Sequence, residues 1–500
     1  MKRRLFLQSS AAAAAAISIP SAQALAAALD TLAKVSGDTL AVTGGGADIT
    51  LEQAAVKELS DSLLGRLLLP GQEGYDLARR VLNPTIDKHP ALIVQPSGAA
   101  DIMHAVTFAR ERDLLLAVKC GGHSFSGKST CEGGMQIDLS SMRSARIDAG
   151  SRTAYISGGS LLGELDHESM ALGLVTTAGT VSHTGVGGLT LGGGFGRLAR
   201  RFGLALDNVT GVDIVTADGK LQHASAQENP DLYWAVRGGG GNFGVITSFE
   251  FQLHPMDREV IGGEVVFPLA QARDILSFYA DYAASAPDEL YLDLVLSSEA
   301  GTTDGVILLH ACYSGPQEQA EKVLGPIRKA GKPINDTIKT IDYVAIQRSW
   351  DNTDPRTTGS YLKSGFISEL PDPLIDTITR EFQAVPERAT IMFFQHAGGA
   401  IGRVPVDATA FAHRYSMANM FAVVSWPMEE SRDSHVKAIK DYWANLAPFT
   451  HGWYTNDVDD HSSNRIHRNY QGNYERLARI KNQYDPGNLF RLNANVKPKA

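Results

Sequence analysis

The chain has 500 residues, of which 43% are hydrophobic and 20% charged, so it can bury a large core and divide into two or three domains. Its net charge of −9 argues against a nucleic acid or an anionic membrane as partner, because clustered Lys and Arg bind such surfaces. Downstream of the N-terminal leader no apolar run is long enough to cross a bilayer, so we expect no membrane-spanning segment.

The N-terminus has the three parts of an export signal. Arg3 and Arg4 precede Leu-Phe-Leu, an alanine-rich apolar stretch continues to Pro20, and A-L-A at 24–26 supplies a small-residue cleavage site. The pattern is that of a twin-arginine signal over residues 1–26, with an ordinary secretory signal as the alternative. We therefore expect a periplasmic or secreted protein that is exported after folding around any tightly held cofactor.

The chain has three cysteines, Cys120, Cys131 and Cys312. This odd, small number does not make a disulfide framework in an exported chain of this length, although one bridge between Cys120 and Cys131 stays open. The fourteen histidines include no H-E-x-x-H sequence, and the cysteine spacing does not fit a zinc site, so we expect no metal.

After an N-terminal segment with little signal, apolar runs and turn signals alternate as in an α/β unit. A short buried strand at 91–94 is followed by a turn and a helix at 102–110, and the next strand, at 114–118, ends at a glycine-rich stretch. Such units bind ligands beyond the carboxyl ends of their strands, so this stretch, residues 119–127, is the first candidate site. Further strands are predicted at 135–139 and 153–157, and a helix at 160–171.

The candidate stretch reads K-C-G-G-H-S-F-S-G. Gly121 and Gly122 let the backbone bend and approach a ligand closely, and successive N–H groups in such a turn form a concave site for phosphate oxygens. The imidazole of His123 then lies beside whatever the turn holds. A core histidine in a glycine turn is the plainer alternative.

The same stretch also matches a P-loop pattern. Residues 122–129, G-H-S-F-S-G-K-S, fit G-x-x-x-x-G-K-[ST] and follow a strand. A P-loop must open into a helix whose N-terminus faces the phosphates, but residues 129–134, S-T-C-E-G-G, break any helix within one turn. The sequence therefore disfavours a nucleotide-hydrolysing P-loop.

Two more glycine clusters follow. Residues 179–203 contain G-V-G-G-L-T-L-G-G-G-F-G, too many glycines for an ordinary helix or strand, so we expect the chain to turn repeatedly or to lie flat on a ligand. Residues 237–244, R-G-G-G-G-N-F-G, precede a strand predicted at 245–251. No cluster has G-x-G-x-x-G between a strand and a helix, which argues against a Rossmann dinucleotide site. Three glycine clusters instead indicate one long ligand threaded through a domain.

The middle of the chain alternates helices with strands. We predict helices at 267–284, 317–329 and 434–446, and strands at 291–296, 305–313 and 417–426. On the last of these strands Asn419, Phe421, Val423 and Ser425 share one face, because side chains of a strand alternate with a period of two.

The order of these motifs resembles that of one known group of flavoproteins. A strand ending in G-G-H-S is followed by the long glycine run, by D-N-V before V-D-I-V-T-A-D-G, and by D-L-Y-W-A-V-R-G-G-G-G-N-F-G. Near the C-terminus N-Y, R-L and Y-D-P, with Asn488 and Phe490, continue the match. The sequence resembles the FAD-linked oxidases of the berberine bridge enzyme-like group, within the vanillyl-alcohol oxidase superfamily, over residues 89–255 and 451–498.

The resemblance implies an α+β fold with a two-subdomain FAD-binding domain of the PCMH type at residues 86–257, after an N-terminal segment at 27–85. A second α+β domain at 258–450, built on an antiparallel sheet, would bind the substrate. The berberine-type segment at 451–500 would return to the FAD-binding domain.

In this group the histidine of G-G-H-S bonds to the 8α-methyl of the flavin, which the resemblance carries to His123. Val181 takes the place of a cysteine that gives many members a second bond, so a single covalent link to FAD is implied, with His183 as a wall residue. Thr184 holds the position that often decides oxygen access to the flavin, and its size permits that access. The implied cofactor residues are Lys119, Cys120, Gly121, Gly122, His123, Ser124, Phe125, Ser126 and Gly127 at the pyrophosphate, Thr180, Val181, Thr184, Gly185, Gly187, Gly188, Gly241, Asn242, Gly244 and Val245 along the rest of FAD, and Asn493 and Asn495 at the isoalloxazine.

Removal of hydride from a C–OH or C–N carbon requires a side chain that takes up the other proton. The group often uses the tyrosine of a Y-x-N element, which matches Tyr454, and Asp457 and His451 are further candidates. Free tyrosine has a pKa of about 10, so a nearby cation or the flavin itself would have to assist its deprotonation. Phe125 stands where several members place another tyrosine, which removes one hydroxyl from the site.

The resemblance thus implies an FAD-dependent oxidase that takes hydride from an organic alcohol, sugar or amine and passes the electrons to molecular oxygen, giving hydrogen peroxide. It makes Asn419 and Phe421 candidates for substrate binding. A dehydrogenase with another electron acceptor is the nearest alternative, and a flavin-loaded binding protein without turnover is the alternative from a different class.

Overall fold

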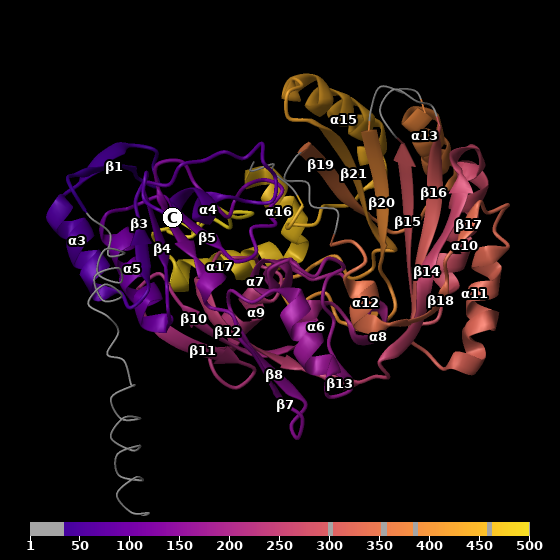
Figure 1. Cartoon of the computed structure of the whole chain (residues 1–500), viewed down its shortest axis with the longest axis horizontal. Coiled ribbons are helices and arrows are strands. Elements are labelled where there is room, and N and C mark those ends of the chain that lie inside the picture. Colours follow the sequence, from indigo (N-terminus) through magenta and orange to yellow (C-terminus); the bar gives the residue numbers. More distant parts are fainter. Residues whose placement is uncertain (1–34, 299–303, 352–357, 384–388, 458–462, 500) are drawn as a thin grey trace, which may run out of the picture.

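The computed structural model describes residues 35–298, 304–351, 358–383, 389–457 and 463–499, so the predicted export signal at 1–26 lies outside the described residues. The described chain forms three units built on sheets, followed by a C-terminal helical segment (Figure 1). In these ranges we find no helix with the length and apolar character needed to span a bilayer.

The first unit is an open sheet covered by helices. Its elements are β1 (Thr39–Val42), β2 (Asp48–Leu51), α3 (Gln53–Ser62), β3 (Arg66–Leu68), α4 (Tyr75–Arg79), β4 (Leu92–Gln95), α5 (Ala99–Glu111), β5 (Leu116–Lys119) and β6 (Met135–Asp138). The sheet order is β3-β4-β6-β5, in which β4, β6 and β5 run parallel and β3 is antiparallel. Apolar residues of α3 and α5 are buried against the strands, which fixes the direction in which β5 leaves the sheet.

The second unit is an antiparallel sheet. Its elements are β7 (Ala145–Asp148), β8 (Thr153–Ser157), α6 (Leu162–Met170), β9 (Leu174–Val175), α7 (Val186–Gly192), α8 (Ala199–Phe202), β10 (Val209–Val215), β11 (Leu221–Ser225), α9 (Pro230–Val236), β12 (Val245–Gln252) and β13 (His254–Pro255). Its five main strands follow the order β11-β10-β12-β8-β7, and β9 pairs with β13 apart from them. The sheet therefore places the chain that enters β12, which is the third glycine cluster, next to the end of β10.

The second glycine cluster contains a helix that the sequence did not predict. Residues V-G-G-L-T-L-G form α7, so the expectation of repeated turns or extended chain at 179–203 was wrong for this segment. Glycine costs a helix about 1 kcal/mol per residue relative to alanine, so α7 depends on its packing. That packing needs glycine, because a Cβ at Gly185, just before the helix, would lie 2.4 Å from the backbone nitrogen of Gly121.

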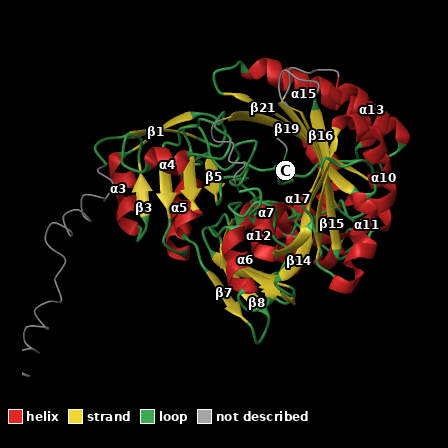
Figure 2. Ribbon diagram, turned by 45° about the vertical axis from the view of Figure 1, so that its right-hand side comes forward, coloured by secondary structure: helices red, strands yellow, loops and turns green. Residues whose placement is uncertain are grey.

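The third unit is a large antiparallel sheet with helices on one face (Figure 2). Its elements are β14 (Glu259–Pro268), α10 (Ala272–Ser285), β15 (Leu290–Ser298), β16 (Gly305–Tyr313), α11 (Ala320–Arg328), β17 (Asn335–Asp336), β18 (Lys339–Asp342), α12 (Tyr343–Gln347), β19 (Thr358–Ile367), α13 (Asp372–Gln383), β20 (Ala389–His396), α14 (Ala400–Arg403), β21 (Ala418–Pro427) and α15 (Arg432–Leu446). The strand order is β17-β14-β16-β15-β20-β21-β19, with β18 also beside β14. The helix predicted from residue 267 begins later than expected, because Phe267 and Pro268 end β14.

The chain ends in α16 (Ser463–Tyr470) and α17 (Tyr474–Tyr484), which pack into the core of the second unit. In Figure 1 the yellow α17 lies among the elements of the first two units, and α16 lies between them and the orange strands of the large sheet. Segments from the two ends of the chain therefore meet near the helix-free face of the third sheet.

Candidate active site

The predicted cofactor loop leaves β5 as a series of turns. Residues 120–134 contain no helix, which a P-loop would require, so the P-loop alternative does not fit the structure. Gly122 and Gly127 have φ values of +70° and +67°, in the left-handed region that favours glycine. The Lys119 side chain points into the first unit, where its Nζ donates to the Ala78 carbonyl at 2.5 Å, so any contact of Lys119 with a ligand falls to its main chain.

His123 faces the second glycine cluster. Its Nε2 lies 2.6 Å from Nδ1 of His183, and its Nδ1 lies 3.2 Å from the Thr184 hydroxyl. Thr184 was predicted to border the flavin, whereas His183 was predicted only as a wall residue. Sequence reasoning missed the contact between the two imidazoles because it joins positions 60 residues apart.

The backbones of the first two glycine clusters touch. A Cβ at Gly121 would lie 2.3 Å from the Gly185 nitrogen, so neither position accepts a larger residue without movement. Cys120 lies in the same contact, and its thiol donates to the Ser160 carbonyl at 3.5 Å. Its burial raises the pKa of the thiol to about 11. All three cysteines are free, so Cys120 and Cys131 do not form the bridge that the sequence left open.

The third glycine cluster is joined to the C-terminal segment. Asn242 donates from Nδ2 to the Gly239 carbonyl at 2.7 Å and to the Ala494 carbonyl at 3.0 Å, while its Oδ1 accepts from the main-chain N–H of Val496. Asn493 donates to the Gly241 carbonyl at 3.0 Å. The Asn242 side chain is thus engaged in joining the two segments, and these bonds bring two sets of predicted cofactor residues together.

Helix α7 links all of these segments. The Leu191 carbonyl near its C-terminus accepts from the N–H groups of Gly238 and Gly240 at 3.0 and 2.9 Å. The Leu189 carbonyl accepts from Asn456 Nδ2 at 3.1 Å. Because Gly185 at the start of α7 touches Gly121, one short helix contacts the two other glycine clusters and the Y-x-N element.

Tyr454 is buried at the C-terminal end of α7. Its phenol oxygen accepts from the Gly194 N–H and from Asn456 Nδ2, both at 2.8 Å. The ring belongs to an apolar cluster that includes Phe195 and Phe366. Burial raises the pKa of Tyr454 above its usual range, and the two donors only partly offset this effect. The phenol is therefore neutral near pH 7.

Asp457 lies beside Tyr454 and faces the third sheet. Its Oδ2 accepts from Asn419 Nδ2 at 3.1 Å, and its N–H donates to the Tyr454 carbonyl at 3.0 Å. Burial of the carboxyl raises the pKa of Asp457 to about 7, although hydrogen bonds from Asn419 and Ser364 lower it in part. His451, the other candidate, is exposed and lies 3.3 Å from the Ser416 hydroxyl.

The predicted face of β21 is confirmed. Met420, Ala422, Val424 and Trp426 are buried under the helices, and the intervening side chains point to the helix-free face. On that face Phe421 stacks on Phe393 with ring centroids 4.8 Å apart, and Trp350 meets Phe393 edge to face. Asn419 is buried between Gln395 and Asp457. The two predicted substrate-binding residues therefore belong to one surface of aromatic and amide groups.

A second polar group on this sheet was not predicted. The guanidinium of Arg197 donates to the Thr180 carbonyl at 3.1 Å and to Gln347 at 2.9 Å, and it lies against His310 on β16. His310 in turn contacts Glu264 on the neighbouring strand at 3.2 Å. Arg197 is 2% exposed, and it ties the second glycine cluster to the third sheet. Apart from its place in the glycine run, no sequence pattern indicated a role for Arg197.

The residues present fit a large polar cofactor such as FAD. His183 Nε2, Asn495 Oδ1 and Asn419 Oδ1 are buried and have no hydrogen-bond partner among the described residues. An unpaired buried polar atom costs about 1–3 kcal/mol, and a bound ligand with donors and acceptors removes that cost. Two of these atoms belong to predicted site residues, and the third belongs to the ring that faces His123.

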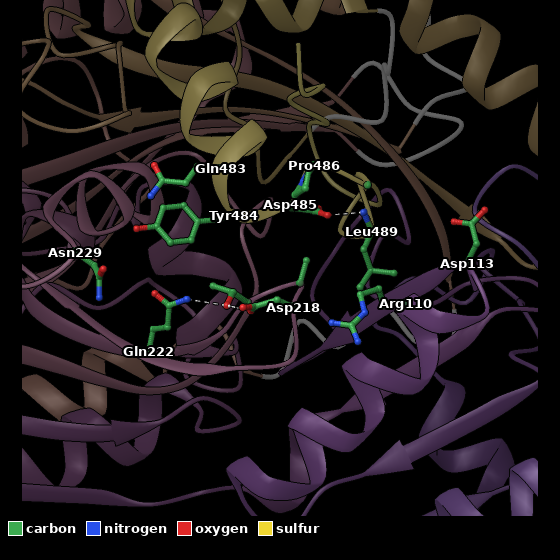
Figure 3. Close-up of a pocket in the computed structure, with 13 residues that line it drawn as sticks. Arg110, Asp113, Asp218, Gln222, Asn229, Gln483, Tyr484, Asp485, Pro486 and Leu489 are labelled. Atoms are coloured by element: carbon green, nitrogen blue, oxygen red, sulfur yellow. Dashed lines mark hydrogen bonds between the residues drawn. The ribbon is translucent and has the colours of Figure 1, made fainter. Parts of the chain in front are cut away.

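The cavity drawn in Figure 3 lies elsewhere. It has a volume of about 520 Å³ and is bordered by Arg110 at the end of α5, Asp218 in the turn after β10, and Tyr484 at the end of α17. None of the predicted cofactor, catalytic or substrate residues lines it. We therefore place the candidate active site at α7 and not in this cavity.

Comparisons with known proteins identify the family. The family described as FAD binding domain matches residues 90–225, and the family described as berberine and berberine like matches residues 453–497. An FAD-linked oxidoreductase of Dictyostelium discoideum is 35% identical over 449 residues, which cover 89% of this chain and 97% of the relative. Chitooligosaccharide oxidase of Gibberella zeae is 27% identical over 481 residues, which cover 89% of this chain and 95% of that protein.

The fold leads to the same group. The crystal structure of 6-hydroxy-D-nicotine oxidase from Arthrobacter nicotinovorans matches with a TM-score of 0.81 and 26% identity, over 88% of this chain and 99% of that one. The predicted α+β fold with a PCMH-type FAD-binding domain and an antiparallel substrate sheet is confirmed. The chain belongs to the berberine bridge enzyme-like group of FAD-linked oxidoreductases.

Proposed function

We propose that this oxidoreductase is an oxidase that holds FAD through one covalent bond to His123, oxidises an organic alcohol, sugar or amine, and reduces dioxygen to hydrogen peroxide. The observation that carries the proposal is the place of His123 at the meeting point of two glycine clusters, 3.2 Å from the hydroxyl of Thr184. Val181 stands in the same turn where a second bond would need a cysteine, which supports a single link.

Bound FAD supplies the acceptor for hydride from the substrate carbon. The chain supplies the loop at 119–127, the start of α7 and the joined segments around Asn242 and Asn493 to hold it. The aromatic and amide face of β21 supplies the surface for an organic substrate, through Phe421 and Asn419. The relatives are named for a chitooligosaccharide and for a nicotine derivative, so the substrate classes to test are carbohydrates, alcohols and amines.

The proton that leaves with the hydride needs an acceptor. We propose Tyr454 as the catalytic residue that contacts the reacting group, because two donors from separate segments meet at its oxygen. Burial keeps its phenol neutral, so bound substrate or FAD has to lower its pKa before it accepts the proton. Asp457 is the second candidate, because its pKa of about 7 suits a general base at neutral pH. Asp457 accepts from Asn419 on β21, and Tyr454 accepts from Gly194 just after α7, so either can serve a substrate bound on β21.

Flavin bleaching tests this function. The purified protein is mixed without oxygen with carbohydrates, aryl alcohols and amines, and loss of the yellow absorbance marks a substrate. Oxygen is then readmitted, and one hydrogen peroxide per substrate consumed identifies an oxidase. Bleaching that oxygen reverses only slowly would identify a dehydrogenase, and failure of every substrate class to bleach the flavin would contradict an enzymatic role.

The covalent bond is tested separately. Acid precipitation leaves covalent flavin in the pellet, so wild-type protein should give a yellow pellet and the His123→Ala variant a colourless one. Yellow supernatant from fully loaded wild-type protein would refute the link, whatever the activity.

We also propose export through the twin-arginine route. The proposal is supported by Arg3 and Arg4 before the apolar leader. Replacing both by lysine should keep the protein in the cytoplasm, because lysine preserves the charge that an ordinary secretory signal needs. Unchanged export of that variant would favour the secretory alternative.

A further inference from the structure

We propose that His183 takes the ring proton from His123 as the bond to FAD forms, and so promotes attachment of the cofactor. This inference rests on the proposed link at His123. The two imidazoles are in direct contact, with His123 Nε2 2.6 Å from His183 Nδ1 and ring centroids 4.7 Å apart at 46°. One of the two facing nitrogens must carry a proton at this distance, so the rings share a hydrogen bond.

The fold holds His183 in this position. Its turn, residues 181–184, is attached to the first turn of α6 by two main-chain hydrogen bonds, of 2.9 and 2.8 Å. The neighbouring Ser182 donates its N–H and its hydroxyl to the two carboxylate oxygens of Asp351, at 2.9 and 2.5 Å. These bonds hold the turn that carries His183 from two sides.

The contact leaves one nitrogen of His123 for bond formation. A neutral imidazole has one N–H and one lone pair. With Nε2 engaged by His183, Nδ1, whose neighbour is the Thr184 hydroxyl at 3.2 Å, is the nitrogen that would bond to the flavin methyl group. Loss of the Nε2 proton to His183 increases the electron density of the ring and hence its nucleophilicity. His183 Nε2 has no hydrogen-bond partner among the described residues. No neighbouring protein group therefore forces the proton of His183 onto Nδ1, and Nδ1 can accept the proton of His123.

The step balances with dioxygen as oxidant. One N–H bond of His123 and one C–H bond of the flavin methyl group are replaced by one N–C bond. This releases two protons and two electrons, and dioxygen accepts all of them to become hydrogen peroxide. His183 holds the proton of the imidazole only until dioxygen has accepted both protons, so it is unchanged at the end.

The test follows the covalent bond directly. The variants are His183→Ala and His183→Gln, whose amide fills space without accepting a proton, and His167→Ala, an exposed histidine on α6, is the control. Flavin in the acid-precipitated pellet and in the supernatant is measured for each protein as purified and at intervals after adding FAD, with and without millimolar imidazole. We expect both His183 variants to bind FAD and, as purified, to hold it without a covalent bond. After FAD is added, they should form the bond at least about tenfold more slowly than the wild type.

Free imidazole should restore attachment in His183→Ala, where the missing ring leaves space, and should not do so in His183→Gln. Attachment by His183→Ala at the wild-type rate would overturn the proposal. Slow attachment together with weak FAD binding and no rescue by imidazole would also overturn it, because that result describes a wall residue. A wild-type protein that holds all of its flavin without a bond would instead refute the link at His123, which separates the two failures.

Discussion

Replacing Tyr454 by phenylalanine removes one oxygen from the centre of the proposed site and leaves the ring in its apolar cluster. The oxygen accepts two hydrogen bonds, so two donors lose their partner. The Gly194 N–H is buried there and costs about 1–3 kcal/mol when unpaired. Asn456 already donates to the Leu189 carbonyl, so its loss is smaller, about 0.5–1 kcal/mol. We expect Tyr454→Phe to destabilise the protein by about 1.5–4 kcal/mol.

The same variant should slow flavin reduction. A positioned proton acceptor contributes roughly 10²–10⁴ in rate, so the anaerobic reduction rate in a stopped-flow experiment should fall by that range while the flavin spectrum is retained. Substrate affinity should change little, because the ring still fills its place. A variant that reduces its flavin at the wild-type rate would refute the role of Tyr454, and one with unchanged thermal stability would refute the hydrogen bonds to its oxygen.

Three further changes follow from the geometry. If Asp457 is the base, the flavin reduction rate rises as the pH increases through about 7, since only the ionised carboxylate accepts a proton, and Asp457→Asn should abolish this rise. A wild-type pH profile in the variant would exclude Asp457 as the proton acceptor. Burial raises the pKa of Asp166 to about 7, so the folded protein loses stability as the pH rises from about 4 to 7. Asp166→Asn should be more stable than wild type at pH 8, by up to about 4 kcal/mol, and equal to it at pH 4, in thermal unfolding. Gly185→Ala should lower stability and bound flavin, because its Cβ meets Gly121, whereas Gly188→Ala, with no atom within 4 Å, should not unfold the protein.

Elements with strong local patterns could be predicted from the sequence. The strands at 153–157 and 305–313 have the predicted bounds, because apolar residues and turn signals mark both ends. Helix α7 could not be predicted, since its glycines disfavour a helix locally and only contacts with distant segments stabilise it. The start of the helix predicted from residue 267 was wrong for a similar reason, because β14 pairs with β16 as far as Pro268 and the helix begins only at Ala272.

The residues of the candidate site also differ in whether the sequence could predict them. His123 and Thr184 could be identified because they stand in motifs that resemble a known group. His183 and Arg197 stand in the same glycine run, but their roles come from partners far along the chain, namely His123 and Gln347. A motif describes neighbours in sequence, so contacts made by the folded chain between motifs are not visible in it.

The glycines of this protein serve two purposes that are difficult to separate in the sequence. Those at Gly121 and Gly185 are required for the backbone of one cluster to touch that of another, whereas a Cβ at Gly188 would meet no atom of the chain within 4 Å. The first kind brings His123 to its partner histidine, and through α7 it also sets the position of Asn456 beside Tyr454. A small shift at the start of α7 would therefore disturb the proposed cofactor attachment and the proposed proton transfer together. This coupling explains why a helix so poorly favoured by its own residues lies at the centre of the site.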